Sequence, residues 1–316
     1  MPNLNILVIN NLADRHMKII QSSAPNSNII TCDYEKAAEH IRDIDILVPW
    51  GSMDVRPLYL AAPKLTWIHS LSAGVEGLIF PEIQNANTII TNSRGIHGIP
   101  VSEHVFAMML VFTRGLDVFI RQQAKHQWKR TMVDEIHDKT IGIVGLGSIG
   151  REIAKKAKGL GMKVVASKQT MTKELFVDEL YPPEKLHELL SFSDFVVTAL
   201  PLLKETKHLF TINEFSVMKP SAYFINIARG GIIKQDDLIT ALEQGLIKGA
   251  CLDVFDEEPL SDSSPLWDMQ NVIITPHVAA LSPSYLDRAV KLFADNLSRF
   301  QQNKEMLNII DKVKGY

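Results

Sequence analysis

The chain has 316 residues, of which 22% are charged and 46% hydrophobic, and its formal net charge at pH 7 is -3. These values are typical of a soluble globular protein, and the length is sufficient for two domains. Because lysine and arginine are spread along the chain and no apolar run is long enough to span a bilayer, neither a nucleic-acid partner nor a membrane is expected.

The N-terminus begins with an apolar run at residues 4–10 and lacks the basic region and cleavage site of a signal peptide. Cys32 and Cys251 both fall within apparent buried strands. We therefore expect no disulfide framework and predict a cytoplasmic protein. The sequence suggests no metal-binding residues.

Strand-like runs in the first third of the chain alternate with helical patterns, which predicts a small parallel α/β domain. These runs lie at residues 4–10, 28–33, 45–50, 66–70 and 88–92. Pro100 then opens a helix whose apolar residues, from Val101 to Leu116, recur at helical spacing. We interpret this helix as a hinge between two domains.

A second set of strand-like runs follows the hinge helix, and its order and spacing match a doubly wound sheet. These runs lie at residues 140–144, 163–166, 195–199, 222–227, 249–254 and 272–275. A last helix is predicted to begin at Pro283, with Ser282 as its N-cap. Because this helix follows the final strand of the second sheet, it could return to the first domain.

The first strand of the second set leads into a G-x-G-x-x-G turn, in the sequence IGIVGLGSIG at residues 141–150. The first glycine permits a tight turn, the second lets a pyrophosphate approach the backbone, and the third lets the next helix pack on its strand. A helical segment, Gly161 and another strand complete a βαβ unit, which predicts dinucleotide binding rather than an ordinary glycine-rich turn. The expected cofactor loop is Gly145, Leu146, Gly147, Ser148, Ile149 and Gly150.

The segment after the next strand reads Ser167-Lys168-Gln169-Thr170 and has no acidic residue. NAD-selective proteins place a carboxylate here, which accepts a hydrogen bond from the ribose 2′-OH and would repel a 2′-phosphate. An ammonium at Lys168 between the hydroxyls of Ser167 and Thr170 suits a phosphate, which predicts a preference for NADP(H). In the alternative interpretation Lys168 is solvated and NAD(H) is also used.

Three polar residues follow successive strands of the second set. Arg229 lies in NIARGG, Glu258 in LDVFDEEP and His277 in TPH. We expect all three outside the carboxyl ends of their strands, where open α/β sheets bind ligands. Gly230 and Gly231 are expected to leave room for a ligand beside the guanidinium.

These residue types suit hydride exchange at a carbon that carries an oxygen and a neighbouring carboxylate. Arginine offers a planar fork to a carboxylate, histidine exchanges a proton with the oxygen, and a carboxyl group orients the imidazole and favours its charged form. Taken singly, Arg229 could form a surface ion pair, Glu258 could belong to a solvated acidic loop, and His277 could be a core histidine. The ordered set favours the catalytic interpretation.

The ordered motifs GLGSIG, NIARGG, LDVFDEEP and TPH resemble the D-isomer-specific 2-hydroxyacid dehydrogenase family, and the likeness covers nearly the whole chain. Further matching segments are HSLSAGVEGL at 69–78, TNSRGIHGIPVSEH at 91–104, ALPLLKETKHLF at 199–210 and PLWDMQNVIITPH at 265–277. The SKQT segment is more similar to the NADPH-using glyoxylate/hydroxypyruvate reductases than to the NAD-dependent lactate or phosphoglycerate branches.

The resemblance implies a fold with two doubly wound parallel-sheet α/β domains. A Rossmann nucleotide-binding domain, residues 99–283, would be inserted into a flavodoxin-like substrate-binding domain, residues 1–98 and 284–316, in a homodimer. Arg229 would bind the substrate carboxylate and carbonyl, and His277 would be the acid/base with Glu258 as its partner.

The remaining site residues are also implied by the resemblance. The backbone of a small-residue turn would bind the substrate carboxylate, a role assigned to Ser72, Ala73 and Gly74. Asp253 would orient the nicotinamide carboxamide. Other cofactor contacts are expected from Leu200, Pro201, Thr206 and Ala228. Trp50 could either cap an apolar substrate side chain or fill the core.

The predicted activity is reduction of small 2-oxo acids, first glyoxylate and hydroxypyruvate, to D-2-hydroxy acids. One alternative is a broad-range NAD-dependent D-2-hydroxyacid dehydrogenase. A formate dehydrogenase-like activity is disfavoured, because that branch has glutamine where this chain has Glu258. A non-enzymatic alternative is a nucleotide-sensing protein resembling the C-terminal-binding corepressors.

Overall fold

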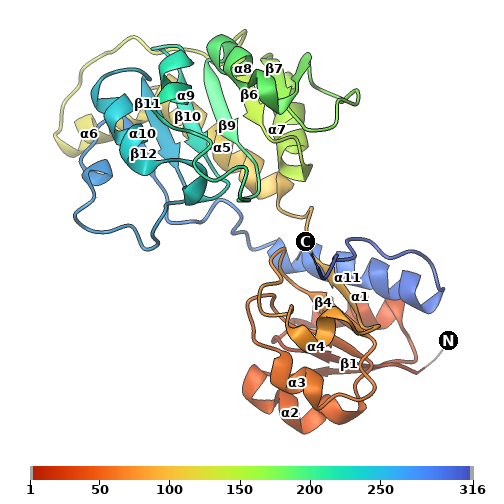
Figure 1. Cartoon of the computed structure of the whole chain (residues 1–316). Helices are drawn as coiled ribbons and strands as arrows, with labels where there is room; N and C mark the ends of the chain where they lie inside the picture. The colour runs from red at the N-terminus through yellow and green to blue at the C-terminus, as the bar shows by residue number, and fades with distance from the viewer. Residues whose placement is uncertain (1–2, 314–316) are drawn as a thin grey trace. The chain divides into compact units, whose positions relative to one another are not determined.

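The computed structural model describes residues 3–313, which divide into two compact units. One unit comprises the described residues up to Ile96 together with those from Ser282 onward, and the other runs from His97 to Leu281. Each unit is built on one sheet whose strands all pair in parallel, with helices against its faces (Figure 1).

The sheet of the first unit consists of β1 (Asn5–Val8), β2 (Asn28–Thr31), β3 (Ile46–Val48), β4 (Trp67–Ser70) and β5 (Ile89–Asn92). Its strand order, β2-β1-β3-β4-β5, is that of a flavodoxin-like fold. In β1, Ile6 and Val8 pack into one core cluster and Leu7 into another. Both faces of the sheet are covered, which explains why β1 reads as a continuous apolar run.

Helices α1 (Asp14–Ser23) and α11 (Tyr285–Gln301) lie side by side against one face of this sheet (Figure 1). The last helix therefore belongs to the first unit, where Phe293 packs against Trp67 with ring centroids 5.3 Å apart. Three short helices contribute to the core on the other face: α2 (Ala37–His40), α3 (Arg56–Leu60) and α4 (Pro81–Gln84).

The sheet of the second unit consists of β6 (Thr140–Val144), β7 (Lys163–Ser167), β8 (Glu179–Tyr181), β9 (Phe195–Thr198), β10 (Tyr223–Asn226), β11 (Gly249–Leu252) and β12 (Val272–Ile274). Its order is β12-β11-β10-β9-β6-β7-β8. After β8 the chain crosses back over β6 to β9, so the strand order reverses between β6 and β9. That reversal is the topological switch point, where doubly wound folds bind their ligands.

Helices cover both faces of the second sheet. On one face, α5 (Gly98–Thr113) packs against α7 (Ser148–Gly159), and both contribute to one core cluster. On the other face lie α8 (Leu186–Phe192), α9 (Ile212–Val217) and α10 (Gln235–Glu243). Helix α6 (Leu116–Ala124) follows α5 and has no fully buried residue.

Two helix boundaries and one strand differ from the sequence-based expectation. The hinge helix ends at Thr113 because Gly115 adopts a left-handed conformation with φ 63°, so Leu116 starts α6. Helix α11 begins at Tyr285 rather than Pro283, and the Ser282 hydroxyl accepts a hydrogen bond from the N–H of Ser284 at 3.2 Å. Strand β8 was not predicted, because a three-residue edge strand with an exposed glutamate makes no apolar run.

Both cysteine thiols are free and buried, Cys32 directly after β2 and Cys251 in β11. Burial raises the pKa of each thiol. Within residues 3–313, no helix combines the length and the apolar character needed to cross a membrane.

Candidate active site

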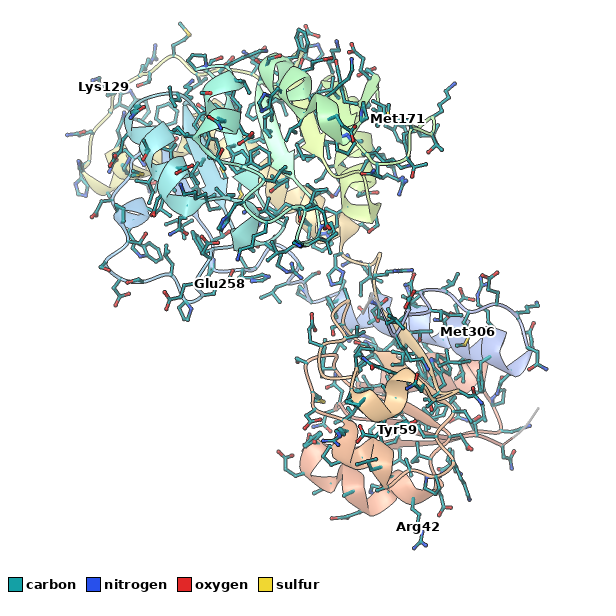
Figure 2. All side chains as sticks on the ribbon, viewed as in Figure 1. Arg42, Tyr59, Lys129, Met171, Glu258 and Met306 are labelled. Carbon is teal, nitrogen blue, oxygen red and sulfur yellow. The ribbon has the colours of Figure 1, made fainter. Side chains whose placement is uncertain are left out.

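The predicted site residues of the second unit follow the carboxyl ends of parallel strands that are neighbours in one sheet. These ends therefore lie along a single edge of the sheet, on both sides of the switch point. From β12 to β7 this edge carries His277, Glu258, Arg229, Leu200, the glycine loop and Ser167. Figure 2 labels Glu258 on the loop that follows β11.

His277 and Glu258 form a hydrogen-bonded pair. Nδ1 of His277 lies 2.7 Å from Oε2 of Glu258, and the backbone N–H of Phe255 donates to Oε1 of the same carboxylate at 3.0 Å. Both carboxylate oxygens are thus fixed, while half of the His277 side chain remains exposed to solvent. This arrangement orients an accessible imidazole, as proton transfer requires.

The pKa of Glu258 reflects opposing effects. Partial burial raises it, but the hydrogen bonds from His277 and Phe255 and the charges of His277 and Arg229 outweigh burial, so the pKa lies below its ordinary value of 4.5. The carboxylate is therefore ionised at neutral pH. Its contribution to stability is fully present above pH 4.5 and is lost as the pH falls through the lowered folded-state pKa.

Asp253 holds the turn that carries His277. His277 has φ 53°, in the left-handed region that non-glycine residues seldom adopt. Its N–H donates to the Asp253 carbonyl at 2.9 Å. The Asp253 carboxylate is buried and accepts hydrogen bonds from Thr275 Oγ1 at 2.6 Å, Val278 N at 2.9 Å and Ala279 N at 3.0 Å. These contacts fix an otherwise unfavourable backbone conformation.

His104 of α5 is a neighbour of this turn that the sequence reasoning missed. Its Nε2 lies 3.0 Å from Thr275 Oγ1 and 3.7 Å from Asp253 Oδ1. Burial lowers the pKa of His104, although the Asp253 charge acts in the opposite direction. The available signal was a histidine within the otherwise apolar stretch of the hinge helix.

Arg229 is exposed, and its Nη1 donates to the Ala228 carbonyl at 2.7 Å. Its positive charge contributes to the lowered pKa of Glu258. A Cβ at Gly230 would lie 1.9 Å from the Phe255 carbonyl carbon, so this glycine permits close packing of two loops. A Cβ at Gly231 would face Leu202 at 3.2 Å.

The glycine loop has the geometry of a cofactor cradle. Gly145 has φ 104°, and a Cβ at Gly150 would lie 2.4 Å from the Gly145 carbonyl oxygen, so α7 starts in close contact with the turn. A Cβ at Gly147 would meet nothing within 4 Å. Gly147 lines a cavity of about 570 Å³, whose other predicted cofactor residues are Gly145, Leu146, Ser167, Lys168, Leu200, Pro201 and Thr206.

The residues present therefore fit a dinucleotide. The backbone at Gly147 is open to the cavity, and the N-terminus of α7 begins at Ser148, one residue later. Thr206 Oγ1 accepts from Leu203 N and donates to the Pro201 carbonyl, both at 2.7 Å, which stabilises the opposite wall. The cavity does not include Ser148, Ile149, Gly150, Thr170, Ala228 or Asp253 among its lining residues.

Alanine at two of these glycines should have different consequences. Gly150→Ala is expected to destabilise the fold by about 1–3 kcal/mol through overpacking, whereas Gly147→Ala should change stability by less than about 0.5 kcal/mol. Gly147→Ala should instead weaken NADPH binding on the order of tenfold, because the methyl group would obstruct the pyrophosphate. Urea unfolding and calorimetric titration measure the two effects, and equal stability of both variants would contradict this assignment.

Lys168 lies at the end of the cavity beside Ser167, but its ammonium is already engaged. It donates to Glu174 Oε1 at 2.5 Å and to Thr172 Oγ1 at 2.8 Å. Arg151, directly after the third glycine, also binds Glu174. Sequence reasoning missed both Arg151 and Glu174. An arginine in the first turn of a helix is unfavourable to the helix dipole and could have indicated a local acidic partner.

The predicted substrate loop lies in the first unit, after β4. The Ser72 hydroxyl accepts from Gly51 N at 3.0 Å, and Asn92 Nδ2 donates to the Ala73 carbonyl at 2.5 Å. Within residues 3–313, the N–H groups of Ala73 and Gly74 make no hydrogen bond. The turn thus presents free backbone donors, as an anion-binding loop does.

Trp50 packs against the core of the first unit. Its ring stacks on Tyr285 with centroids 5.8 Å apart, and the Tyr285 hydroxyl donates to the Leu71 carbonyl at 3.0 Å. This pair connects α11 to the start of the substrate loop.

Known proteins of one family are similar to this chain. A family profile for the NAD binding domain of D-isomer specific 2-hydroxyacid dehydrogenases matches residues 106–279. A glyoxylate reductase from Pyrococcus furiosus is 33% identical over 88% of this chain and 85% of its own.

Two solved structures are also similar. A D-isomer specific 2-hydroxyacid dehydrogenase family protein from Aeromonas salmonicida has a TM-score of 0.87 at 33% identity, covering 98% of this chain and all of that one (100%). An NADPH-dependent glyoxylate/hydroxypyruvate reductase from Sinorhizobium meliloti, solved with NADP and sulfate, has a TM-score of 0.80 at 28% identity, covering 99% and 100% of the two chains.

Proposed function

Because the chain belongs to the D-isomer specific 2-hydroxyacid dehydrogenase family, we propose that it reduces small 2-oxo acids of the glyoxylate and hydroxypyruvate type to D-2-hydroxy acids, with NADPH preferred over NADH. The observation that carries this proposal is the position of Arg229 and the His277–Glu258 pair at the same sheet edge as the glycine-loop cavity. The names of the Pyrococcus and Sinorhizobium relatives support the substrate class.

The proposed roles follow from the chemistry of each group. The reduced nicotinamide, when bound, supplies the hydride. Arg229 binds the substrate carboxylate and polarises the carbonyl oxygen through its planar fork. Protonated His277 donates its proton to that oxygen as it becomes a hydroxyl. Glu258 orients the imidazole and stabilises its positive charge.

The first unit supplies a proposed carboxylate-binding loop. The N–H groups of Ala73 and Gly74, beside Ser72, make no hydrogen bond in the part of the chain that the structure describes, and two adjacent backbone donors suit an anion. The proposed role of Asp253 at the nicotinamide is less direct, because its carboxylate already accepts three hydrogen bonds from the His277 turn. We propose that Asp253 acts mainly by positioning His277.

We also propose a homodimer formed through the second unit, as the resemblance implies. Apolar side chains on α6 and the segment after it are strongly exposed, with Trp128 and Met132 both at 95% of their full accessibility and Ile120 at 63%. Large apolar side chains exposed along one segment favour association.

A panel of 2-oxo acids assayed with each reduced cofactor tests the activity. We expect the highest kcat/KM for glyoxylate and hydroxypyruvate, and higher values with NADPH than with NADH. A preference for NADH of about tenfold, equivalent to ~1.4 kcal/mol, would contradict the cofactor assignment. NADPH binding without turnover of any 2-oxo acid would instead support a nucleotide sensor.

A further inference from the structure

The loop between β7 and β8 carries a carboxylate that is held by two cations. Arg151 donates from Nε and Nη2 to the two oxygens of Glu174, at 2.8 and 2.7 Å, and Lys168 donates to one of them at 2.5 Å. We propose that Glu174 controls cofactor selectivity: its carboxylate neutralises the cations that a 2′-phosphate needs, so the phosphorylated cofactor binds only when Glu174 releases Lys168.

The position of this cluster connects it to the cofactor cavity. Lys168 lines the cavity together with Ser167 and Gln169, and its ammonium donates a hydrogen bond to Glu174. Arg151 belongs to the first turn of α7, directly after the glycine loop. Glu174 lies three residues beyond Met171, which Figure 2 labels on the same loop. The Glu174 side chain is only 10% exposed, so its carboxylate is packed against its two cationic partners rather than solvated.

The charges explain why the two anions compete. Lys168, Arg151 and Glu174 together carry one net positive charge. A 2′-phosphate monoester adds roughly −1.5 to −2 at neutral pH, which would leave the cluster negative if Glu174 stayed in place. Two anions on one ammonium repel each other. Release of Glu174 gives a nearly neutral cluster of two cations and one phosphate.

The same carboxylate suits the cofactor that lacks the phosphate. NAD-selective proteins bind the ribose 2′-OH through an acidic residue at the end of the second strand, and the SKQT segment has none. Glu174, six residues beyond Lys168, brings a carboxylate to that strand end through its bond to the Lys168 ammonium. Glu174 therefore opposes NADPH more strongly than NADH, because only NADPH brings a second anion to Lys168.

The negative charge of the Glu174 carboxylate is present throughout the neutral pH range. The hydrogen bond from Arg151, followed by that from Lys168, lowers the pKa of Glu174 from 4.5 to about 2. Protonation of Glu174 near neutral pH therefore does not release Lys168, and only movement of the loop or substitution of the residue does.

Glu174→Gln tests the proposal by equilibrium binding. The amide keeps the size of the side chain and removes its charge. We expect the Kd values for NADPH and for 2′,5′-ADP, measured by calorimetry without substrate, to fall on the order of tenfold. The Kd for NADH should stay unchanged or rise, because an amide is a weaker acceptor for the 2′-OH.

Two control variants separate charge from packing. Glu179→Gln removes the same charge from β8, where the carboxylate pairs with Lys163 at 2.7 Å, and should leave all three Kd values within about twofold of wild type. Glu174→Asp retains the charge and should keep the NADPH to NADH ratio near that of wild type. Thermal melting establishes that each variant is folded.

The inference rests on the proposed function only in taking a nicotinamide dinucleotide as the ligand. Different results would contradict the proposed NADPH preference and the proposed role of Glu174. If wild type binds NADH more tightly but Glu174→Gln shifts the ratio toward NADPH, the proposed preference is wrong and the role of Glu174 stands. An unchanged ratio in Glu174→Gln, or a shift toward NADH, would overturn the inference. A shift toward NADH would mean that Glu174 positions Lys168 to bind the 2′-phosphate of NADPH.

Discussion

Replacement of His277 by alanine is expected to lower kcat for glyoxylate reduction by about 10²–10⁴-fold, the usual contribution of a positioned acid. The Kd for NADPH should change little, because His277 does not line the glycine-loop cavity. Steady-state kinetics and calorimetric titration measure the two quantities. A kcat within about threefold of wild type would remove His277 from the proton transfer.

Glu258→Gln is the matched variant for this prediction, because it keeps the size of the side chain while removing the negative charge and one of the two acceptor oxygens that face His277 and the Phe255 N–H. Glu258 acts through His277 and is a positioning residue, so the expected loss in kcat is smaller than for His277→Ala. The lowered pKa of Glu258 means that its carboxylate is ionised and places a negative charge beside His277 throughout the neutral range. Without that charge, the alkaline limb of the pH profile for reduction should move to lower pH. A purely structural role would lower activity without moving this limb.

Most of the fold could be predicted because parallel strands covered on both faces are continuous apolar runs. Strands such as β6 and β9 have this character, and each was expected at nearly its observed position. Strand β8 could not be predicted, because an edge strand with exposed Glu179 lacks the pattern. The break between α5 and α6 depends on one left-handed residue, Gly115, and the apolar spacing continues across it.

The candidate site was predictable to the extent that strand ends determine it. Parallel pairing of β10, β11 and β12 brings Arg229, Glu258 and His277 to one edge, so their order along the chain was informative. The surroundings of Lys168 were not predictable in this way. Its partners Thr172 and Glu174 belong to an irregular loop, where no periodic pattern indicates which side chains turn toward the strand end.

The other large effect is expected for Arg229→Lys, which should lower kcat/KM for glyoxylate on the order of 10²-fold. Hydrogen bonds to charged groups are worth about 1.5–3 kcal/mol each, and a point charge cannot reproduce the two parallel bonds of a guanidinium fork. Because Arg229 is proposed to bind the ground-state carboxylate and the carbonyl that reacts, KM should rise and kcat should fall together.

The pKa of Glu258 provides an independent control, because lysine at position 229 retains the positive charge that helps to lower this pKa. The acid limb of the pH profile should therefore stay in place while kcat/KM falls, and unchanged KM and kcat in Arg229→Lys would exclude a guanidinium from substrate binding.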